Sequence, residues 1–474
     1  MYYKLNELVA LRGWKLVPFA CYIYGVREAQ ALTLKQYGLL SLCDGEHNLE
    51  PSEALNQMIR AKMIVPCERG DHISDWQKPR NYANRYFPHL NWAITGKCNF
   101  NCRHCFMASD NAPMMEEFTW EQCLDLLDGC ERCGVQTLTL TGGEPMLHPR
   151  FMDIVRECAR RHLYIAEINT NGSFLTEKML DEFKRLDMHP LIKISYDGVG
   201  HHDWLRNSPG AEEKAIRAIQ LCKTEGFSVR AQTNVHRGNL DVMYDTVAQL
   251  DAQGVEEIRI IRTTETPRWN ENGKGQCLEL DEYYEAMLKL IKKIVQGGHR
   301  IDVDVWQFAY FYPSNKTYYY HPVQCQCGKY QDSIPVCKGA RGTIAVAHTG
   351  ELSPCNQLAG TFAKLGIRCG NVKKTPLQKL LSQGDYLDLV TMPVSMVREH
   401  NDVCQNCSYW EACMGGCRAI STALTKDFLH YDPAKCLFFK GGYMKKIDEV
   451  FASADYRCGD DTGNMNKDGE PGHR

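Results

Sequence analysis

Three closely spaced cysteines carry the clearest chemistry in the chain. Cys98, Cys102 and Cys105 form a C-x3-C-x2-C pattern directly after a short apolar run that predicts a strand. Iron–sulfur clusters are normally held by four cysteine thiolates. Because this set stops at three, a cubane cluster bound here keeps one iron without a protein ligand. The pattern therefore predicts an iron–sulfur cluster with an open coordination site for a substrate or cofactor.

A zinc site or a redox-active thiol pair is the alternative for the same cysteines. C-x2-C pairs in reducing compartments are often zinc ligands. Structural zinc sites take four protein ligands. A triad without an obvious fourth ligand therefore favours the cluster.

A second motif, Gly142-Gly143-Glu144-Pro145, follows the next strand-like run. Together with the cysteine pattern, in which His104 precedes the last cysteine, it resembles the radical S-adenosylmethionine (radical SAM) enzymes. The resemblance implies that the amino and carboxylate groups of SAM chelate the open iron, and it places His104 in the cofactor-binding loop. Gly142 and Gly143 would permit close backbone approach to the ligand. Glu144 would accept a hydrogen bond from the SAM ammonium.

The size and composition of the chain limit its class. Its 474 residues are enough for two or three domains, and a net charge of −3 gives no electrostatic reason to expect nucleic acid. No apolar run reaches the roughly 18 residues that would span a bilayer. The N-terminus lacks the apolar core of a signal peptide, so we expect a cytoplasmic protein without a membrane partner. The 23 cysteines then indicate metal binding, and oxygen-labile clusters predict an anaerobic host.

Strand-like and helical patterns alternate through the second segment, residues 89–310. Such alternation implies a parallel sheet, and active sites of α/β barrels lie at the carboxyl ends of the strands. Six strand–helix units match the partial (β/α)6, TIM-like barrel that the family resemblance implies, so the fold class is α/β. The expected strands are 92–95, 137–140, 165–168, 191–195, 229–232 and 257–261, and the expected helices are 120–132, 151–161, 177–186, 212–225 and 242–253.

Further polar residues follow the fourth expected strand. Ser195-Tyr-Asp197-Gly resembles a Ser-x-Asp-Gly segment of the family, and Arg206 follows it. The resemblance implies that Ser195, Asp197 and Arg206 belong to the cofactor site, where relatives contact the ribose and carboxylate of SAM. A hydroxyl and a guanidinium suit those contacts. A simple turn after the strand is the alternative. No residue of the chain is identified as a catalytic acid or base.

The first segment, residues 1–88, predicts a small domain of its own. Strand-like runs at 15–19 and 22–26, helical patterns at 33–42 and 52–60, and an apolar end at 63–65 resemble a winged helix. The pattern is similar to the leader-recognition domain fused to many peptide-modifying enzymes. A structural N-terminal extension is the alternative.

Cysteines dominate the third segment, residues 311–452. Their order resembles the SPASM extension of radical SAM enzymes, which implies two auxiliary [4Fe–4S] clusters and therefore three clusters in all. The resemblance assigns Cys337, Cys355 and Cys417 to the first auxiliary cluster. Cys325 or Cys327 would complete it, or else one iron stays open. The ligands of the second are Cys404, Cys407, Cys413 and Cys436. A polar tail, residues 453–474, predicts disorder.

The resemblance implies reductive cleavage of SAM to a 5′-deoxyadenosyl radical, with flavodoxin or ferredoxin as electron donor. Our leading hypothesis is that the radical abstracts hydrogen from a ribosomally made precursor peptide, whose leader binds residues 1–88, and installs a crosslink or another modification. One alternative is formylglycine-type protein oxidation or another radical SAM/SPASM activity. A more distant one is a non-catalytic metal-binding scaffold.

Overall fold

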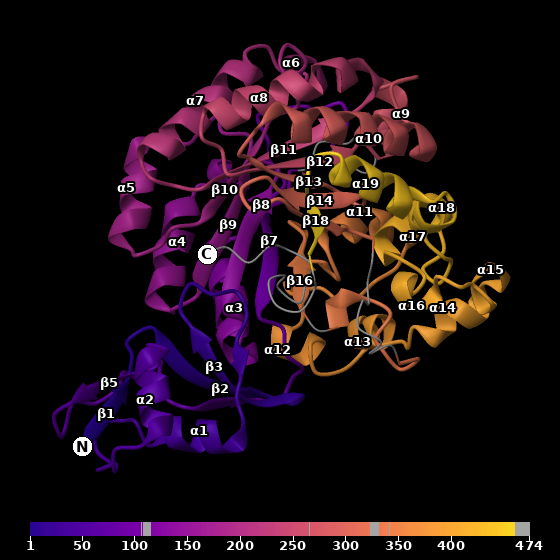
Figure 1. Ribbon diagram of the computed structural model, residues 1–474. Coiled ribbons are helices and arrows are strands. Elements are labelled where there is room, and N and C mark those ends of the chain that lie inside the picture. The colour runs from indigo at the N-terminus through magenta and orange to yellow at the C-terminus, as the bar shows by residue number, and fades with distance from the viewer. Residues whose placement is uncertain (106, 108–114, 265, 323–330, 341, 460–474) are drawn as a thin grey trace.

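A computed structural model describes residues 1–105, 107, 115–264, 266–322, 331–340 and 342–459. The chain forms three parts: an N-terminal domain, a central sheet wrapped by helices, and a C-terminal region of short helices beside the sheet (Figure 1). Cys325 and Cys327 lie outside the described residues, so their predicted role is not addressed by the structure.

The central part is the predicted parallel α/β sheet. Six strands pair as parallel neighbours in chain order, with near-continuous burial, as expected where helices cover a parallel sheet. All six lie at the predicted positions, and most are one to three residues longer. They are β7 (His89–Thr95), β8 (Thr137–Gly142), β9 (Tyr164–Thr170), β10 (Leu191–Ser195), β11 (Val229–Val235) and β12 (Glu257–Arg262).

Helices between these strands cover the outer face of the sheet (Figure 1). Their ends follow local signals: Thr119 caps the first by accepting from the Gln122 amide, and Gly134 ends it in the left-handed conformation. Cys123, Cys130 and Cys158 are fully buried on these helices, as small apolar residues would be. The helices are α3 (Trp120–Cys133), α4 (Phe151–Arg160), α5 (Glu177–Arg185), α6 (His202–Arg206), α7 (Ala211–Thr224), α8 (Met243–Ala252), α9 (Pro267–Asn272) and α10 (Leu280–Gly297).

Strands from later in the chain extend the sheet at both edges. One edge gains β16 (Thr343–Val346), parallel to β7, and then β17 (Leu352–Ser353). The other gains β13 (Asp302–Val305), β14 (Ala309–Tyr312), β15 (Thr317–Tyr320) and β18 (Arg457–Cys458). The predicted boundary between 310 and 311 therefore falls inside β14, because the sheet is shared by the second and third segments.

The first residues of the predicted disordered tail are ordered in the structure. Arg457–Cys458 pairs with β15 in parallel register, and the Tyr456 ring packs against Phe451 and Phe311. Strand pairing at the sheet edge and aromatic packing therefore order residues 453–459. The polar composition of this segment does not indicate either contact. The remainder of the predicted tail, 460–474, lies outside the described residues.

The C-terminal region is built from short helices that pack on one another and on the sheet. Leu358 of α11, Val397 of α14 and Phe438 of α18 are fully buried there. The helices are α11 (Asn356–Leu365), α12 (Leu377–Leu380), α13 (Asp385–Val390), α14 (Ser395–His400), α15 (Asp402–Gln405), α16 (Trp410–Cys413), α17 (Arg418–Thr425), α18 (Pro433–Lys440) and α19 (Tyr443–Ala452).

The N-terminal domain has its own apolar core, which includes Leu5, Leu11, Leu40 and Leu55. Both predicted helices are present, but the predicted strand pair is shifted: residues 17–23 form one continuous strand that pairs with an earlier one. The elements are β1 (Tyr2–Leu5), β2 (Val9–Trp14), β3 (Val17–Ile23), β4 (Gln30–Ala31), α1 (Leu34–Ser41), α2 (Glu53–Arg60), β5 (Ile64–Cys67) and β6 (Arg80–Tyr82).

Hydrogen bonds fix this domain to the barrel. The Trp14 indole and the Asn84 amide both donate to the Cys133 carbonyl, at 3.1 and 2.9 Å, and the Tyr22 hydroxyl donates to the Gln136 carbonyl at 3.2 Å. A Cβ on Gly134 would lie 2.4 Å from the Tyr82 ring. The two parts therefore meet in a close, defined contact. Within the described residues, no helix has both the length and the apolar character that a bilayer crossing needs.

Candidate active site

The cysteine loop and the Gly-Gly-Glu-Pro motif meet at the carboxyl ends of β7 and β8. The Gly143 amide donates to the Thr95 carbonyl at 2.9 Å, and the Glu144 amide donates to the Lys97 carbonyl at 2.8 Å. A Cβ on either glycine would lie 2.2 Å from a backbone oxygen of this loop, and Gly142 has a φ of +145°. A side chain at either position would collide with the backbone of the cysteine loop. Both glycines are therefore required by the fold, whatever ligand binds above them.

Donors from the loop itself and from neighbouring elements lie beside two of the three predicted cluster ligands, Cys98 and Cys102. The Phe100 amide donates to Cys98 Sγ at 3.4 Å, and Asn171 Nδ2 lies 4.0 Å from the same sulfur. Arg206 Nη1 lies 3.9 Å from Cys102 Sγ. Burial raises the pKa of Cys98 to about 12 against the Phe100 hydrogen bond, and the nearby Cys102, Glu144 and Cys105 add to the rise. The three thiols are thus close neighbours in a setting whose donors favour sulfur carrying negative charge.

His104 is buried inside this loop. Among the described residues its Nδ1 has no hydrogen-bond partner, and burial together with the Arg206 charge lowers its pKa to about 3. The ring is therefore neutral and keeps one polar nitrogen unsatisfied. An unsatisfied buried nitrogen is uncommon in folded proteins and fits a loop that contacts a bound group.

Glu144 is fully buried and is fixed by three donors. Its carboxylate accepts from the Thr170 hydroxyl at 2.8 Å, from the Asn171 amide at 2.8 Å and from the Met146 amide at 3.3 Å. Burial raises its pKa to about 7, although these hydrogen bonds oppose the rise. A cation bound beside Glu144 would stabilise the ionised carboxylate, the form that burial disfavours.

Asp197, His202 and Arg206 form a buried cluster beside the cysteine loop. Arg206 donates twice to Asp197, at 2.6 and 3.0 Å, and His202 Nδ1 lies 3.0 Å from the same carboxylate. Burial acts to raise the pKa of Asp197, but the Arg206 charge and the His202 contact outweigh it and hold the pKa well below its usual range. Asp197 therefore positions Arg206 against Cys102, while Ser195 ends β10 on the same rim.

The first predicted auxiliary set is gathered by helix starts. Cys355 and Cys417 occupy the N-cap positions of α11 and α17, where the helix dipole favours negative charge. Cys337 Sγ accepts from the Gly339 amide at 3.4 Å. Burial and the thiols of Cys417 and Cys337 raise the pKa of Cys355, so the three predicted ligands are neighbours.

The second predicted auxiliary set is gathered by three short helices. Burial raises the pKa of Cys404 to about 11, with further contributions from the Cys407 and Cys436 thiols. Burial likewise raises the pKa of Cys413 to about 12, with Cys404 among the neighbours that add to it. Cys404 is therefore an electrostatic neighbour of Cys407, Cys413 and Cys436, the other members of the predicted set.

Asp432 connects the two auxiliary sets and was not found by sequence reasoning. This buried side chain caps α18, which carries Cys436, by accepting from the Ala434 and Lys435 amides at 2.9 and 3.1 Å. It also accepts from the Cys417 amide at 2.9 Å. Asp-Pro before a helical run is a helix-start signal that could have found the cap, but nothing in the sequence indicates the bond to Cys417.

The donor sets fit clusters better than single ions. Within the described ranges, no three His, Cys, Asp or Glu side chains converge closely enough to hold one metal ion. A zinc ion needs such convergence, with ligands at about 2.0–2.3 Å. A cubane cluster takes its thiolates at separate irons, so its ligands need only be neighbours. Both the triad and the auxiliary sets meet that condition.

Family comparisons agree with this geometry. The radical SAM superfamily matches residues 92–250, and the SPASM iron–sulfur cluster-binding domain matches residues 337–408. The chain therefore carries a radical SAM domain followed by a SPASM domain. Its cofactors are a [4Fe–4S] cluster and SAM, and the SPASM domain binds additional iron–sulfur clusters.

Curated relatives are similar over most of their length. The AdoMet-dependent heme synthase of Oleidesulfovibrio alaskensis is 24% identical over 367 residues, which cover 72% of this chain and 85% of the relative. The mycofactocin maturase MftC of Mycobacterium tuberculosis is 25% identical over 340 residues, covering 70% of this chain and 78% of the relative.

Solved structures share the fold. Streptococcus suis SuiB bound to precursor peptide SuiA aligns with a TM-score of 0.64 at 13% identity, covering 92% of this chain and 99% of SuiB. The structure of anSMEcpe with AdoMet and the Cp18Cys peptide aligns with a TM-score of 0.55 at 15% identity, covering 77% of this chain and 98% of that one. At these identities the likeness concerns the fold alone.

Proposed function

We propose that this radical SAM/SPASM enzyme modifies a ribosomally made peptide whose leader binds the N-terminal domain. The observation that carries the proposal is that domain itself, an independently cored unit fixed to the barrel through Trp14, Tyr22 and Asn84. SuiB, described with its precursor peptide, matches 92% of this chain, whereas anSMEcpe matches 77%. The difference is comparable in size to residues 1–88. MftC, a named maturase, also supports a peptide substrate.

We assign the residues around the cysteine loop to holding the cofactors. Cys98, Cys102 and Cys105 would bind the cluster, and with SAM it supplies a 5′-deoxyadenosyl radical, the cofactor's own chemistry. Glu144 would accept the SAM ammonium, while Gly142 and Gly143 keep the motif against the loop. Arg206, held by Asp197, screens the negative charge on Cys102.

We further assign the auxiliary clusters to the two cysteine groups of the C-terminal region. Completion of the first by Cys325 or Cys327 remains part of the proposal, as do an electron supply from flavodoxin or ferredoxin, a cytoplasmic location and an anaerobic host. Ser195 and His104 are proposed contacts of the cofactor loop.

Tetrapyrrole modification is the second candidate, because heme synthases are 24% identical to this chain over 72% of its length. The fold alone does not separate it from the leading proposal. The heme synthase covers 72% of this chain and MftC covers 70%, so the matched length does not separate the two candidates either.

Co-expression tests the two candidates directly. The chain is produced anaerobically with each short open reading frame adjacent to its gene, and intact masses of the peptides are measured. A mass change that disappears with Cys102→Ala supports peptide modification. Conversion of an added iron porphyrin, with every neighbouring peptide unchanged, would establish the second candidate instead.

A further inference from the structure

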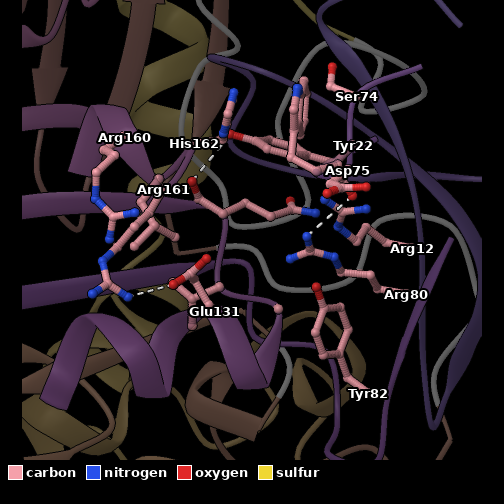
Figure 2. Close-up of a pocket in the computed structure, with 15 residues that line it drawn as sticks. Arg12, Tyr22, Ser74, Asp75, Arg80, Tyr82, Glu131, Arg160, Arg161 and His162 are labelled. Carbon is pink, nitrogen blue, oxygen red and sulfur yellow. Dashed lines mark hydrogen bonds and ion pairs between the residues drawn. The ribbon is translucent and has the colours of Figure 1, made fainter. Parts of the chain in front are cut away.

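A pocket of about 310 Å³ lies where the N-terminal domain meets the barrel. Residues of β2, β3, β6 and the segment 74–76 line one side, and residues of α3, α4 and the segments just before β8 and β9 line the other. Figure 2 shows the side chains that line it. The pocket therefore opens at the amino ends of the barrel strands, the end opposite the cysteine loop. None of the residues assigned to the cofactors lines it.

Two guanidiniums face this pocket without a carboxylate partner among the described residues. Arg12 is 6% exposed and donates to the backbone carbonyls of Leu11, Trp76 and Lys78. Arg80 donates to the Asp75 carbonyl at 3.3 Å. Burial lowers the pKa of Arg12, and Arg80 is among the charges that lower it further. A buried cation that lacks a counter-ion is costly, and an anionic ligand would relieve that cost.

The other charged residues of the pocket are already paired. Arg160 and Arg161 both donate to Glu157, and Arg161 also reaches Glu131. The Asp75 side chain is 89% exposed and pairs with Lys78 at 2.6 Å. Figure 2 shows Arg12 and Arg80 on one side of the pocket and Arg160 and Arg161 on the other. The uncompensated positive charge is therefore confined to the side formed by the N-terminal domain.

Gln136 gives a second, independent sign of a ligand. It is 3% exposed and lines the pocket, yet neither its Nε2 nor its Oε1 has a hydrogen-bond partner in the part of the chain that the structure describes. An amide carries both a donor and an acceptor. A second amide, such as a peptide group, complements both at once. Beside it, the Trp76 and His162 rings stack at 4.5 Å and offer a flat apolar surface.

We propose that this pocket binds an acidic residue of the peptide substrate. The carboxylate pairs with Arg12 and Arg80, the adjoining peptide group pairs with Gln136, and the side-chain stem lies on Trp76 and His162. The assignment rests on the proposed peptide-modifying function and deepens it by giving the leader a specific anchor on the joint between the two domains.

The position of the pocket sets a minimum spacing in the substrate. Gln136 precedes β8 and Gly143 follows it, so anchor and cofactor rim are separated by about 20 Å at about 3.3 Å per strand residue. An extended peptide spans at most about 3.3–3.6 Å per residue. The acidic anchor must therefore lie at least about six residues from the modified residue.

The test measures binding to the iron-loaded enzyme without turnover. The probe is the capped pentapeptide acetyl-Ala-Ala-Glu-Ala-Ala-amide, compared by calorimetry with its Gln counterpart and with inorganic phosphate. We expect the Glu peptide to bind at least about tenfold more tightly than the Gln peptide, because the bonds at stake are charge-assisted. Arg80→Glu and Gln136→Met should each weaken it. Arg69→Glu is the matched control, since Arg69 is exposed on the same domain and does not line the pocket.

Equal binding of the two peptides, or unchanged binding in Arg80→Glu, overturns the site. Phosphate that binds as tightly as the Glu peptide overturns the peptide assignment in favour of a small-anion site. Because these readouts need no reaction, their failure leaves the proposed function standing. If the Glu peptide binds as expected but the enzyme converts only porphyrin, the proposed function is overturned instead. The role of the pocket as a leader anchor is then overturned with it.

Discussion

The cysteine loop of the barrel and the cysteines of the C-terminal region are held in different ways. Cys98, Cys102 and Cys105 lie on a single loop, and side chains from other strand ends reach in to their sulfurs. The auxiliary cysteines are instead spread over the chain from Cys337 to Cys436 and come together through the packing of short helices.

The two groups of cysteines therefore differ in what depends on them: radical chemistry on the triad, and the fold of the C-terminal region on the auxiliary sets. The barrel sheet exists without the triad, because its strands are fixed by their own ladders and a fully buried apolar core. Helices of four residues, such as α15 and α16, are far below the length that is stable alone. Clusters that bind to folded thiolates stabilise what they bind. We therefore expect the triad to control radical formation and the auxiliary sets to control the integrity of their region.

The largest effect should come from Cys102→Ala. SAM cleavage should fall by at least about a thousandfold, about 4 kcal/mol in activation free energy. Iron should drop from about twelve to about eight per chain, as expected for loss of one of three [4Fe–4S] clusters. 5′-Deoxyadenosine production with dithionite and iron assays measure both, and the melting temperature should change little.

Cys404→Ala is the matched comparison. It should leave part of the SAM cleavage, uncoupled from product, and it should lower the melting temperature more than Cys102→Ala does. Equal SAM cleavage in the two variants would contradict the expected difference between the triad and the auxiliary sets.

Asp432→Ala should destabilise the C-terminal region by about 2–4 kcal/mol. Three backbone amides lose their acceptor, including the cap of α18 and the Cys417 amide. Denaturant unfolding and iron content measure the effect, and auxiliary iron should fall while SAM cleavage persists. Asp388→Ala, at an exposed position of α13, is the control and should be nearly neutral. Loss of triad iron alone would contradict the assignment.

Arg206→Lys should weaken cluster retention at the triad by about 10–100-fold, the usual cost of losing an outer-shell partner. Lysine keeps the charge but cannot form the two-pronged bond to Asp197. Iron loss against a chelator, followed over time, reports the change. Arg185→Lys, exposed on α5, should match the parent enzyme. Identical iron loss in both variants would remove Arg206 from the cluster environment.

The smallest expected effect is a pH dependence of SAM binding. The pKa of Glu144 is about 7, raised by burial, so its ionised fraction increases between pH 6 and pH 8. Only the carboxylate pairs with an ammonium, so affinity should rise with pH by about tenfold over this range and level off above it. Equilibrium dialysis should show a flat, weaker profile for Glu144→Gln. A rising profile in that variant would assign the titration to another group.

Local signals were enough to predict much of the barrel and the grouping of its cysteines. The strand at 191–195 matches β10, and the Thr119 cap and Gly134 stop bound α3, because these depend on periodicity and end signals within a few residues. The partition of the auxiliary cysteines into two neighbouring groups followed from the family pattern, and the structure brings each group together.

The missed features depend on contacts between distant residues. The bond from the Cys417 amide to Asp432, the Asn171 contact with Cys98, and the addition of β18 to β15 involve partners that no local pattern identifies. The strand pair of the N-terminal domain was misplaced because β2 and β3 carry almost no polar residues, so no apolar–polar alternation marks where each strand begins and ends. The close approach of Gly143 to the Lys97 carbonyl is a further contact that no local pattern identifies.

The pairing of β7 with β16 has a consequence for how the protein is made. His89 lies opposite Thr343, so one edge of the first barrel strand has no partner until more than half of the chain has been translated. At about 5–20 residues per second, the ribosome needs tens of seconds to supply it. During that interval the nascent barrel presents an unpaired, largely apolar strand, which is a known aggregation hazard. Slow growth and chaperone supply during expression should therefore matter as much for yield as iron.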